Sequence, residues 1–416
     1  MYNKKLKGSI TVPGDKSISH RAVMFASLAK GVSHISGFLN GADCISTINC
    51  FRQMGIEIEQ LNDKVVVKGN GMYGLSRPAK ELYCGNSGTT VRLLSGILCG
   101  QKFSSSLNGD ESIQKSPMAR VIDPLKSMGA NISSLNDSCK TPLFIEPCFL
   151  HGIYYKSPVA SAQVKSAILL AGLYAEGETT VEEIYKSRDH TELMLESFGA
   201  GIKSDDLRAS VSKTDELFAT DITIPGDISS AAFFLVAALI CPGSELLIRN
   251  VGINPTRSGI LEVLKDMGAD IETVDTYTAG SEPCADLLVK YSKLHATTIG
   301  GSMIPRLIDE IPVIAIAASV AEGTTVIKDA AELKVKESNR IKVMCDELSK
   351  LGVDVVETED GMEINGTNKL LGNITINTND DHRIAMTVAI ASTCYEGEII
   401  LDNLDCVKKS YPNFWE

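Results

Sequence analysis

The stretch that decides the fold is residues 13–28, PGDKSISHRAVMFASL, in which a turn leads directly into an apolar helix. Pro13 and Gly14 end the strand before it, and a serine offers an N-cap oxygen to the first helical amides. Lys16 and Arg21 add two cations at a helix N-terminus, where unpaired amides and the helix dipole already favour an anion. The stretch therefore predicts an anion-binding helix start; the simpler alternative is a capped helix with two solvated cations.

Related units recur about every 70 residues along the 416-residue chain. An apolar helical stretch, a glycine and a β-rich run follow one another six times, at Gly31, Gly100, Gly177, Gly243, Gly323 and Gly397. Five amphipathic helices between them are predicted to end at glycine C-caps, namely Gly55, Gly129, Gly199, Gly268 and Gly352. We therefore expect six units of helices and strands, three in each of two domains.

Two of the first helices, in residues 230–240 and 311–318, have almost no polar face and are therefore expected inside their domain. Strands and second helices would then lie outside them, and parallel central helices would present their N-termini at one end. Those N-termini are rich in polar residues, at 15–17, 86–90, 161–163, 227–230, 309–310 and 379–383. Nearby cations oppose the helix dipole, which favours an anion bound between them; they are Lys16, Arg21, Arg92, Lys165 and Arg383.

Composition narrows the classes of partner. The net charge of -12 argues against nucleic acid or an anionic membrane, whereas a small anion can still bind where cations cluster. The longest apolar run, residues 231–241, is too short to span a membrane, and residues 1–7 lack the apolar region of a signal peptide. Eleven cysteines occur without C-x-x-C or metal-type spacing, so we expect reduced thiols, a cytoplasmic location and no metal.

Several motifs together resemble one known family, that of 5-enolpyruvylshikimate-3-phosphate synthase. They run in the family's order through nearly the whole chain: Lys16-Ser17 with Arg21, residues 85–90 with Arg92, residues 187–192, residues 336–340, residues 381–383 and residues 409–412. The resemblance implies enolpyruvyl transfer from phosphoenolpyruvate to shikimate 3-phosphate by addition and elimination, with no metal or organic cofactor. It also implies a monomer.

The resemblance further implies an α/β fold of two inverse, barrel-like domains. Each would contain three βαβαββ repeats with apolar helices inside. Domain I would comprise residues 1–13 and 227–416, domain II residues 14–226, and the active site would lie in the cleft between them.

Site residues follow from the family by position. The shikimate 3-phosphate set is Lys16, Ser17, Arg21, Ser161, Ala162, Gln163, Ser187, Arg188, Asp309 and Lys336. The phosphoenolpyruvate set is Lys16, Asn86, Gly88, Thr89, Arg92, Gln163, Arg340, Arg383 and Lys409. For proton transfer we expect the carboxylates of Asp309 and Glu337, with Lys16 and Lys409 as proton donors or charge stabilisers. The alternative for Glu337 is an exposed helical acid paired with a nearby lysine.

One position departs from the family pattern. Ser116 stands where the family has an arginine before proline, which removes a charge-assisted contact worth about 1.5 to 3 kcal/mol unless Lys115 or Arg120 replaces it. Two alternatives stay open. A UDP-N-acetylglucosamine enolpyruvyl transferase usually has asparagine after the lysine near its start and a reactive cysteine in a mobile loop. Here Ser17 follows Lys16 and residues 113–118 contain no cysteine, so this alternative is disfavoured. A non-catalytic anion-binding paralogue is supported only by Ser116.

Overall fold

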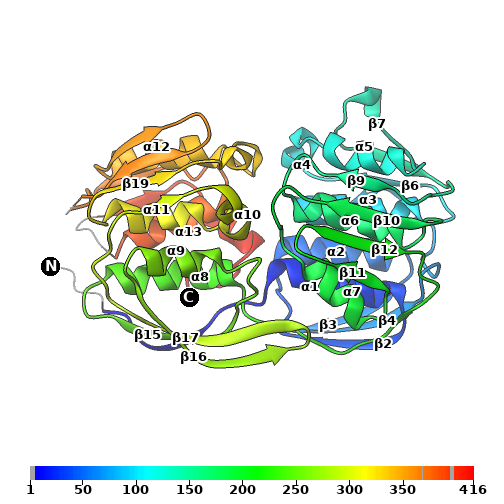
Figure 1. The fold of residues 1–416 in the computed structure, drawn as a ribbon, viewed down its shortest axis with the longest axis horizontal. Helices are drawn as coiled ribbons and strands as arrows, with labels where there is room; N and C mark the ends of the chain where they lie inside the picture. Colours follow the sequence, from blue (N-terminus) through cyan, green and yellow to red (C-terminus); the bar gives the residue numbers. More distant parts are fainter. Residues whose placement is uncertain (1–4, 368, 394–397) are drawn as a thin grey trace. The chain divides into compact units, whose positions relative to one another are not determined.

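The computed structural model describes residues 5–367, 369–393 and 398–416, and Figure 1 shows their helices and strands. The chain divides into two compact units. Unit 1 holds the residues up to Pro13 with Pro225–Thr278 and Pro283–Glu416, and unit 2 holds Gly14–Ile224 and Ala279–Glu282. The chain therefore enters unit 2 directly before the helix predicted at residue 16.

Unit 2 contains three sheets. Their strands are β2 (Ala29–Ser36), β3 (Glu57–Leu61), β4 (Lys64–Asn70), β5 (Leu82–Tyr83), β6 (Ser105–Asn108), β7 (Asn131–Ser134), β8 (Leu143–Glu146), β9 (Tyr154–Lys156), β10 (Glu178–Glu182), β11 (Ile202–Ser204), β12 (Arg208–Ser212), β13 (Leu217–Phe218) and β14 (Ile222–Thr223). The strand orders are β13-β2-β4-β3 with β14 also on β2, β5-β6-β8-β7, and β9-β10-β12-β11. Each sheet combines a parallel pairing with antiparallel strands, which repeats one pattern three times.

The helices of unit 2 alternate with these strands. They are α1 (Lys16–Leu28), α2 (Ala42–Gln53), α3 (Gly88–Cys99), α4 (Glu111–Lys115), α5 (Ala119–Ser127), α6 (Ala162–Gly172) and α7 (His190–Ser197), with the 3₁₀ turn η1 (Leu135–Asp137). Helices α3 and α6 approach closely at Gly96, where a Cβ atom would lie 2.1 Å from the Ala167 carbonyl oxygen. Only glycine therefore allows this contact, and it brings the two helices together over their length.

Unit 1 repeats the sheet pattern in two four-stranded sheets, and its third described sheet is a parallel pair. Its described strands are β1 (Lys7–Thr11), β15 (Glu245–Gly252), β16 (Asp270–Ala279), β17 (Glu282–Lys290), β18 (Thr298–Ile299), β19 (Thr324–Ile327), β20 (Asp354–Glu357), β21 (Met362–Asn365), β22 (Ile374–Ile376) and β23 (Ile399–Leu401). They form the orders β1-β15-β17-β16, β18-β19-β21-β20 and β22-β23. The pairs β1 with β15, β18 with β19 and β22 with β23 are parallel.

The core of unit 1 is built on three helices that pack on one another, α8 (Ile228–Ile240), α11 (Ile311–Ser319) and α13 (His382–Ala391). All of α11 and every residue of α8 except Phe234 are buried, so the prediction of internal apolar helices is confirmed. The remaining helical segments are α9 (Gly259–Asp266), α10 (Ile304–Leu307) and α12 (Arg340–Lys350), with the 3₁₀ turns η2 (Gly301–Met303), η3 (Ala331–Val335) and η4 (Asp405–Lys409).

Most of the glycine pattern is confirmed. The five glycines after α2, α5, α7, α9 and α12 have φ between 81° and 91°, the left-handed conformation that ends a helix. Gly31 is an exception, because α1 ends at Leu28 and this glycine lies within β2. Gly397 lies outside the described residues.

One local prediction was wrong. The N-cap of α1 is Asp15, whose Oδ1 accepts from the Ile18 amide at 2.9 Å, so Ser17 lies inside the first turn. The helix that contains residues 230–240 starts at Ile228, directly after its N-cap Asp227, which confirms the polar N-terminus predicted at 227–230. In both helices an aspartate carboxylate, and not a serine hydroxyl, is the cap.

None of the described helices is long and apolar enough to cross a membrane. No disulfide bond joins the cysteines that the structure describes.

Candidate active site

The start of α1 carries a cation held in place by a carboxylate. The Nζ atom of Lys16 lies 3.1 Å from Oδ2 of Asp43, at the start of α2, and the two side chains are 18% and 10% exposed. The ammonium is thus accessible and has a carboxylate partner. The sequence had suggested only other cations around this lysine. Sequence reasoning missed Asp43, because an acid in the first turn of a helix ordinarily serves the helix dipole.

Arg21 lies one turn further along α1 and is buried. Its guanidinium donates to Oγ1 of Thr191 at 2.7 Å, to the Ser17 carbonyl at 3.0 Å and to Oγ of Ser166 at 2.8 Å. Burial lowers the pKa of Arg21 to about 10, so the group is still a cation at neutral pH. Arg188 donates to the Ser17 hydroxyl at 3.4 Å, so two arginines meet the first turn of α1.

The starts of α3 and α6 are joined by hydrogen bonds. Nη1 of Arg92 donates to Oε1 of Gln163 at 2.6 Å, and Nε2 of Gln163 donates to Oγ1 of Thr89 at 3.0 Å. Gly88 leaves space for this arrangement, because a Cβ atom there would lie 2.7 Å from Nη1 of Arg92. Asn86, just before α3, donates to Asp110 at 2.7 Å. The helix start therefore presents backbone amides beside an oriented guanidinium.

The start of α6 is capped by Ser161, whose hydroxyl accepts from the Val164 amide at 3.5 Å, and Ala162 is the first helical residue. Both are half-buried.

Lys165 does not serve as an anion-binding cation, contrary to the sequence-based expectation. Its Nζ lies 2.8 Å from Glu183 and 2.7 Å from Glu192, and all three side chains are buried. Although burial opposes it, these two carboxylates raise the pKa of Lys165. The same Glu183 accepts from the Ser187 amide at 3.3 Å, while the buried Ser187 hydroxyl has no partner among the described residues. Lys165 therefore fixes the backbone that presents the Ser187 hydroxyl.

The centre of unit 1 is the guanidinium of Arg340, which is 1% exposed. It donates from Nε to Asp381 at 2.9 Å, from Nη1 to Asp309 at 3.1 Å and from Nη2 to Glu337 at 2.6 Å. Burial opposes the charge, but the three carboxylates outweigh it and raise the pKa of Arg340. Burial alone would raise the pKa of Asp381, but the charge of Arg340 outweighs this effect, so the pKa of that carboxyl is lowered.

Glu337 lies in the loop between η3 and α12, with Asn339 as the N-cap of α12. It is 30% exposed and paired with Arg340, so it is not the exposed helical acid of the alternative interpretation. Asp309, 13% exposed, lies just before α11.

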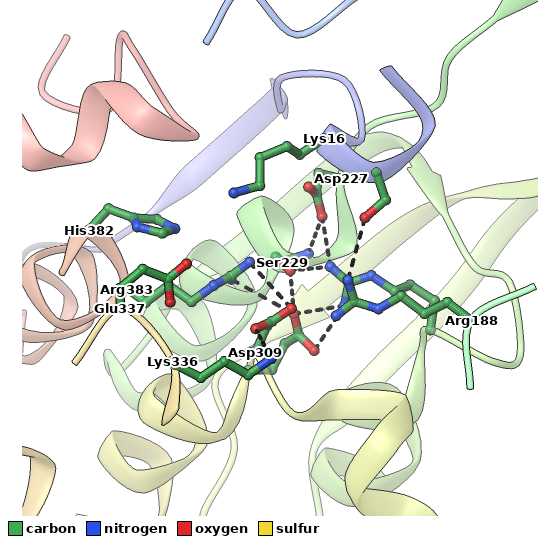
Figure 2. Close-up of polar contacts among 12 residues, drawn as sticks. Lys16, Arg188, Asp227, Ser229, Asp309, Lys336, Glu337, His382 and Arg383 are labelled. Carbon is green, nitrogen blue, oxygen red and sulfur yellow. Dashed lines mark hydrogen bonds and ion pairs between the residues drawn. The ribbon is translucent and has the colours of Figure 1, made fainter. Parts of the chain in front are cut away.

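Two further cations approach Asp309, as Figure 2 shows. Nζ of Lys336 lies 3.9 Å from Oδ1 of Asp309, and Nη2 of Arg383 lies 3.8 Å from Oδ2. Desolvation lowers the pKa of Lys336, although a quarter of its side chain remains exposed and Asp309 opposes the shift. Lys409 is placed differently, because its Nζ lies 2.9 Å from Asp380.

The divergent position, Ser116, ends α4. Its hydroxyl donates to the Ser112 carbonyl at 3.1 Å and so serves the short helix itself. Lys115 is largely exposed and lies 3.7 Å from Glu111, its neighbour one turn away. Both contacts lie within α4, so neither residue replaces the charge-assisted contact of the missing arginine.

The expected residues are divided between the two units, and most of them lie at or near helix starts. The unit 2 group contains Lys16, Ser17, Arg21, Asn86, Gly88, Thr89, Arg92, Ser161, Ala162, Gln163, Ser187 and Arg188. The unit 1 group contains Asp309, Lys336, Glu337, Arg340, Arg383 and Lys409. Groupings of His, Cys, Asp and Glu that could hold a metal ion are absent from the described parts of both units.

Comparisons with known proteins agree along the whole chain. A family model described as EPSP synthase (3-phosphoshikimate 1-carboxyvinyltransferase) matches residues 2–416. Relatives named 3-phosphoshikimate 1-carboxyvinyltransferase occur in Bacillus licheniformis, at 54% identity over 411 residues, and in Bacillus subtilis, at 53% identity over 411 residues. Both alignments cover 99% of this chain and 96% of the relative.

A solved structure of EPSP synthase from Acinetobacter baumannii has the same architecture. It is 47% identical and superposes with a TM-score of 0.89, covering 99% of this chain and 95% of that chain. The mixed α/β fold expected from the sequence is therefore confirmed.

Proposed function

Because this chain belongs to the EPSP synthase family, we propose that it transfers the carboxyvinyl group of phosphoenolpyruvate to the 5-hydroxyl of shikimate 3-phosphate and releases phosphate. The observation that carries the proposal is the pair of carboxylates Asp309 and Glu337, bound to the two outer nitrogens of one buried guanidinium. A protein that only bound anions would need cations at this place and no pair of proton acceptors. Two oriented carboxylates beside Lys336 and Arg383 suit proton transfer within an anion site.

The reaction has two steps, each of which moves one proton. In the addition, the hydroxyl oxygen bonds to C2 of phosphoenolpyruvate, the hydroxyl loses its proton, and the methylene carbon C3 gains one. In the elimination, the bond from C2 to the phosphate oxygen breaks, and C3 returns a proton. Both steps are redox-neutral, and we assign the proton transfers to Asp309 and Glu337, with Lys16 and Lys409 as proton donors or charge stabilisers.

Shikimate 3-phosphate binding is proposed for residues that surround the start of α1 and the buried Ser187 hydroxyl. That hydroxyl has no partner in the described chain, and a buried polar group normally has one. A phosphate oxygen would satisfy it, and Arg21 and Arg188, which both contact Ser17, would supply cations to the same substrate. We add Ser161, the amide of Ala162, Gln163, Asp309 and Lys336 to this set.

Phosphoenolpyruvate binding is proposed for the start of α3 and for the arginines of unit 1. Backbone amides at Gly88 and Thr89 can donate hydrogen bonds to an anion at the positive helix end, and an arginine can bind two of its oxygens at once. The full set is Lys16, Asn86, Gly88, Thr89, Arg92, Gln163, Arg340, Arg383 and Lys409. Both units thus contribute residues to one reaction.

We also propose the finer architecture that the family implies, two inverse α/β domains of three repeats each. One sheet pattern supports it, because the pattern occurs three times in unit 2 and twice in the described part of unit 1. A monomeric, cytoplasmic enzyme is proposed as well, and a reducing compartment agrees with the described cysteines, which are not joined by disulfide bonds.

The product identifies the reaction. Proton NMR of the protein with phosphoenolpyruvate and shikimate 3-phosphate should show new enol ether vinyl signals, and phosphorus NMR should show one inorganic phosphate for each product formed. Asp346→Asn serves as a matched control, since this acid lies on α12 and pairs with Lys342 at 3.2 Å. Absence of the vinyl signals with wild-type protein that binds shikimate 3-phosphate would refute the proposal.

A further inference from the structure

A second buried ion cluster in unit 1 lies behind Asp309 and has no place in the substrate sets above. Its centre is Arg257, in the connection between β15 and α9, whose side chain is 3% exposed. Nη1 of Arg257 donates to both carboxylate oxygens of Glu310, at 2.9 Å and 3.0 Å. Nη2 donates to Asp227 at 3.2 Å and to the Ser229 hydroxyl. One guanidinium therefore joins the start of α8 to the start of α11.

The turn that carries Arg257 is itself fixed. The side-chain oxygen of Asn254 accepts from the Thr256 amide at 2.9 Å and from its hydroxyl at 2.8 Å. The Asn254 carbonyl accepts from the amides of Arg257 and Ser258. This asparagine-proline-threonine turn places the guanidinium before any substrate is present, as a positioning group requires.

Glu310 links this cluster to the candidate active site. It is the N-cap residue of α11, it directly follows Asp309, and its side chain is fully buried. Nη1 of Arg383 lies 4.0 Å from Glu310, while Nη2 of the same guanidinium lies 3.8 Å from Asp309. Arg383 thus spans two adjacent carboxylates, one inside the cluster and one in the site. Figure 2 shows Asp227, Ser229, Asp309 and Arg383 together.

The charges explain what Arg257 does for Arg383. A carboxylate with no exposure needs full compensation, and Arg257 with the Ser229 hydroxyl provides it for Glu310. Without Arg257, Glu310 would still attract Arg383, which lies 4.0 Å away and would be drawn inward and away from the ligand side of Asp309. With Arg257 in place, Arg383 keeps its donors for an incoming anion.

We propose that Arg257 is a positioning residue that sets the affinity for phosphoenolpyruvate by engaging Glu310 and so leaving Arg383 to bind the substrate anion. This inference rests on the role proposed above for Arg383. The two can fail separately: if the proposed function is wrong, the wild type releases no phosphate, whereas if this inference is wrong, an active wild type and an Arg257 variant have the same Michaelis constant.

The test compares Arg257→Met, Arg257→Lys and the double variant Arg257→Met with Glu310→Gln. Arg257→Met should raise the KM for phosphoenolpyruvate about tenfold or more, the size of one weakened charge-assisted contact, and leave the KM for shikimate 3-phosphate within about twofold. Arg257→Lys keeps the positive charge but loses the planar, two-pronged guanidinium, so it should raise the KM for phosphoenolpyruvate by less. It also serves as the test if the methionine variant does not fold. The double variant should recover much of the loss, because no unpaired carboxylate then attracts Arg383.

Arg306→Met is the matched control. Arg306 also binds a carboxylate through two nitrogens, that of Glu262, and contacts the same turn by donating to the Pro255 carbonyl at 2.7 Å. It should lower the unfolding temperature and leave both Michaelis constants unchanged. The proposal is overturned if Arg257→Met and Arg257→Lys behave like this control, or if Glu310→Gln gives no recovery in the methionine background.

Discussion

Asp309 and Glu337 are held by the same guanidinium, since Nη1 of Arg340 binds the first at 3.1 Å and Nη2 binds the second at 2.6 Å. The flat, rigid fork of an arginine fixes the separation and direction of its partners in a way that a lysine cannot. The third partner, Asp381, is fully buried and anchors the fork on the far side. The two exposed edges of this cluster are therefore the carboxylates assigned to proton transfer.

Neutralising either carboxylate should abolish most turnover. Asp309→Asn and Glu337→Gln each should lower kcat by about 100-fold or more, the usual contribution of a general acid or base. The measurement is steady-state phosphate release, with thermal unfolding as a check on folding. Asp346→Asn, on the exposed side of α12, should keep wild-type kcat; equal losses in all three variants would point to a general effect of charge and contradict the assignment.

Helix packing in unit 2 predicts a severe effect at one glycine. Gly96→Ala should lower the free energy of unfolding by about 3 kcal/mol or more, because the new Cβ would lie 2.1 Å from the Ala167 carbonyl oxygen and force α3 from α6. Chemical denaturation measures the loss. Gly201→Ala is the control, since nothing lies within 4 Å of its Cβ position; a tolerated Gly96→Ala would show that the helices do not meet at this glycine.

Two buried histidines should give opposite pH dependences of stability. Burial, together with Lys16 and Arg21, lowers the pKa of His20 well below 6.5. Below pH 6.5 the unfolded chain therefore takes up a proton that the folded chain does not, and stability falls as the pH falls, by up to about 1.4 kcal/mol per pH unit. His20→Gln should remove this slope when unfolding is followed from pH 8 to pH 5.

For His190 the sign is reversed. Although burial opposes it, Glu282, 2.6 Å away, raises the pKa of His190. The pair therefore stabilises most below the unfolded pKa near 6.5 and loses its contribution as the pH rises through the folded value. His190→Gln should thus cost more stability at pH 6 than at pH 9; parallel curves for wild type and variant would contradict the pairing.

Restoring the family residue at position 116 should tighten phosphoenolpyruvate binding. Ser116→Arg should lower the KM for phosphoenolpyruvate about tenfold, since it regains one charge-assisted contact, with little change in the KM for shikimate 3-phosphate. Lys115→Arg, which adds no charge, is the control. An unchanged KM in Ser116→Arg would mean that another cation already takes the place of the missing arginine.

Local patterns predicted the helices well because their signals are local. An amphipathic stretch followed by glycine fixes where a helix ends, and the left-handed φ of Gly55 or Gly352 follows from two or three neighbouring residues. The choice between Asp15 and Ser17 as cap was missed, since both are good caps and the backbone of the preceding turn decides.

Ion partners could not be predicted in the same way. Lys165 looked like an anion-binding cation, yet Glu183 and Glu192, far along the chain, neutralise it once α6 and α7 are in place. Arg257 could only have been suspected from its turn, because its partners Asp227 and Glu310 come from two other helices. Which charged side chains pair over long sequence distances depends on how the helices pack, and a short sequence motif does not predict this packing.

The acceptor of the carboxyvinyl group decides between the two enolpyruvyl transferases. Phosphate release from phosphoenolpyruvate is measured with wild-type protein in the presence of shikimate 3-phosphate or of UDP-N-acetylglucosamine. We expect release with shikimate 3-phosphate only, and loss of this release in Asp309→Asn. Release with UDP-N-acetylglucosamine alone, or no release with either acceptor while shikimate 3-phosphate still binds, would contradict this expectation.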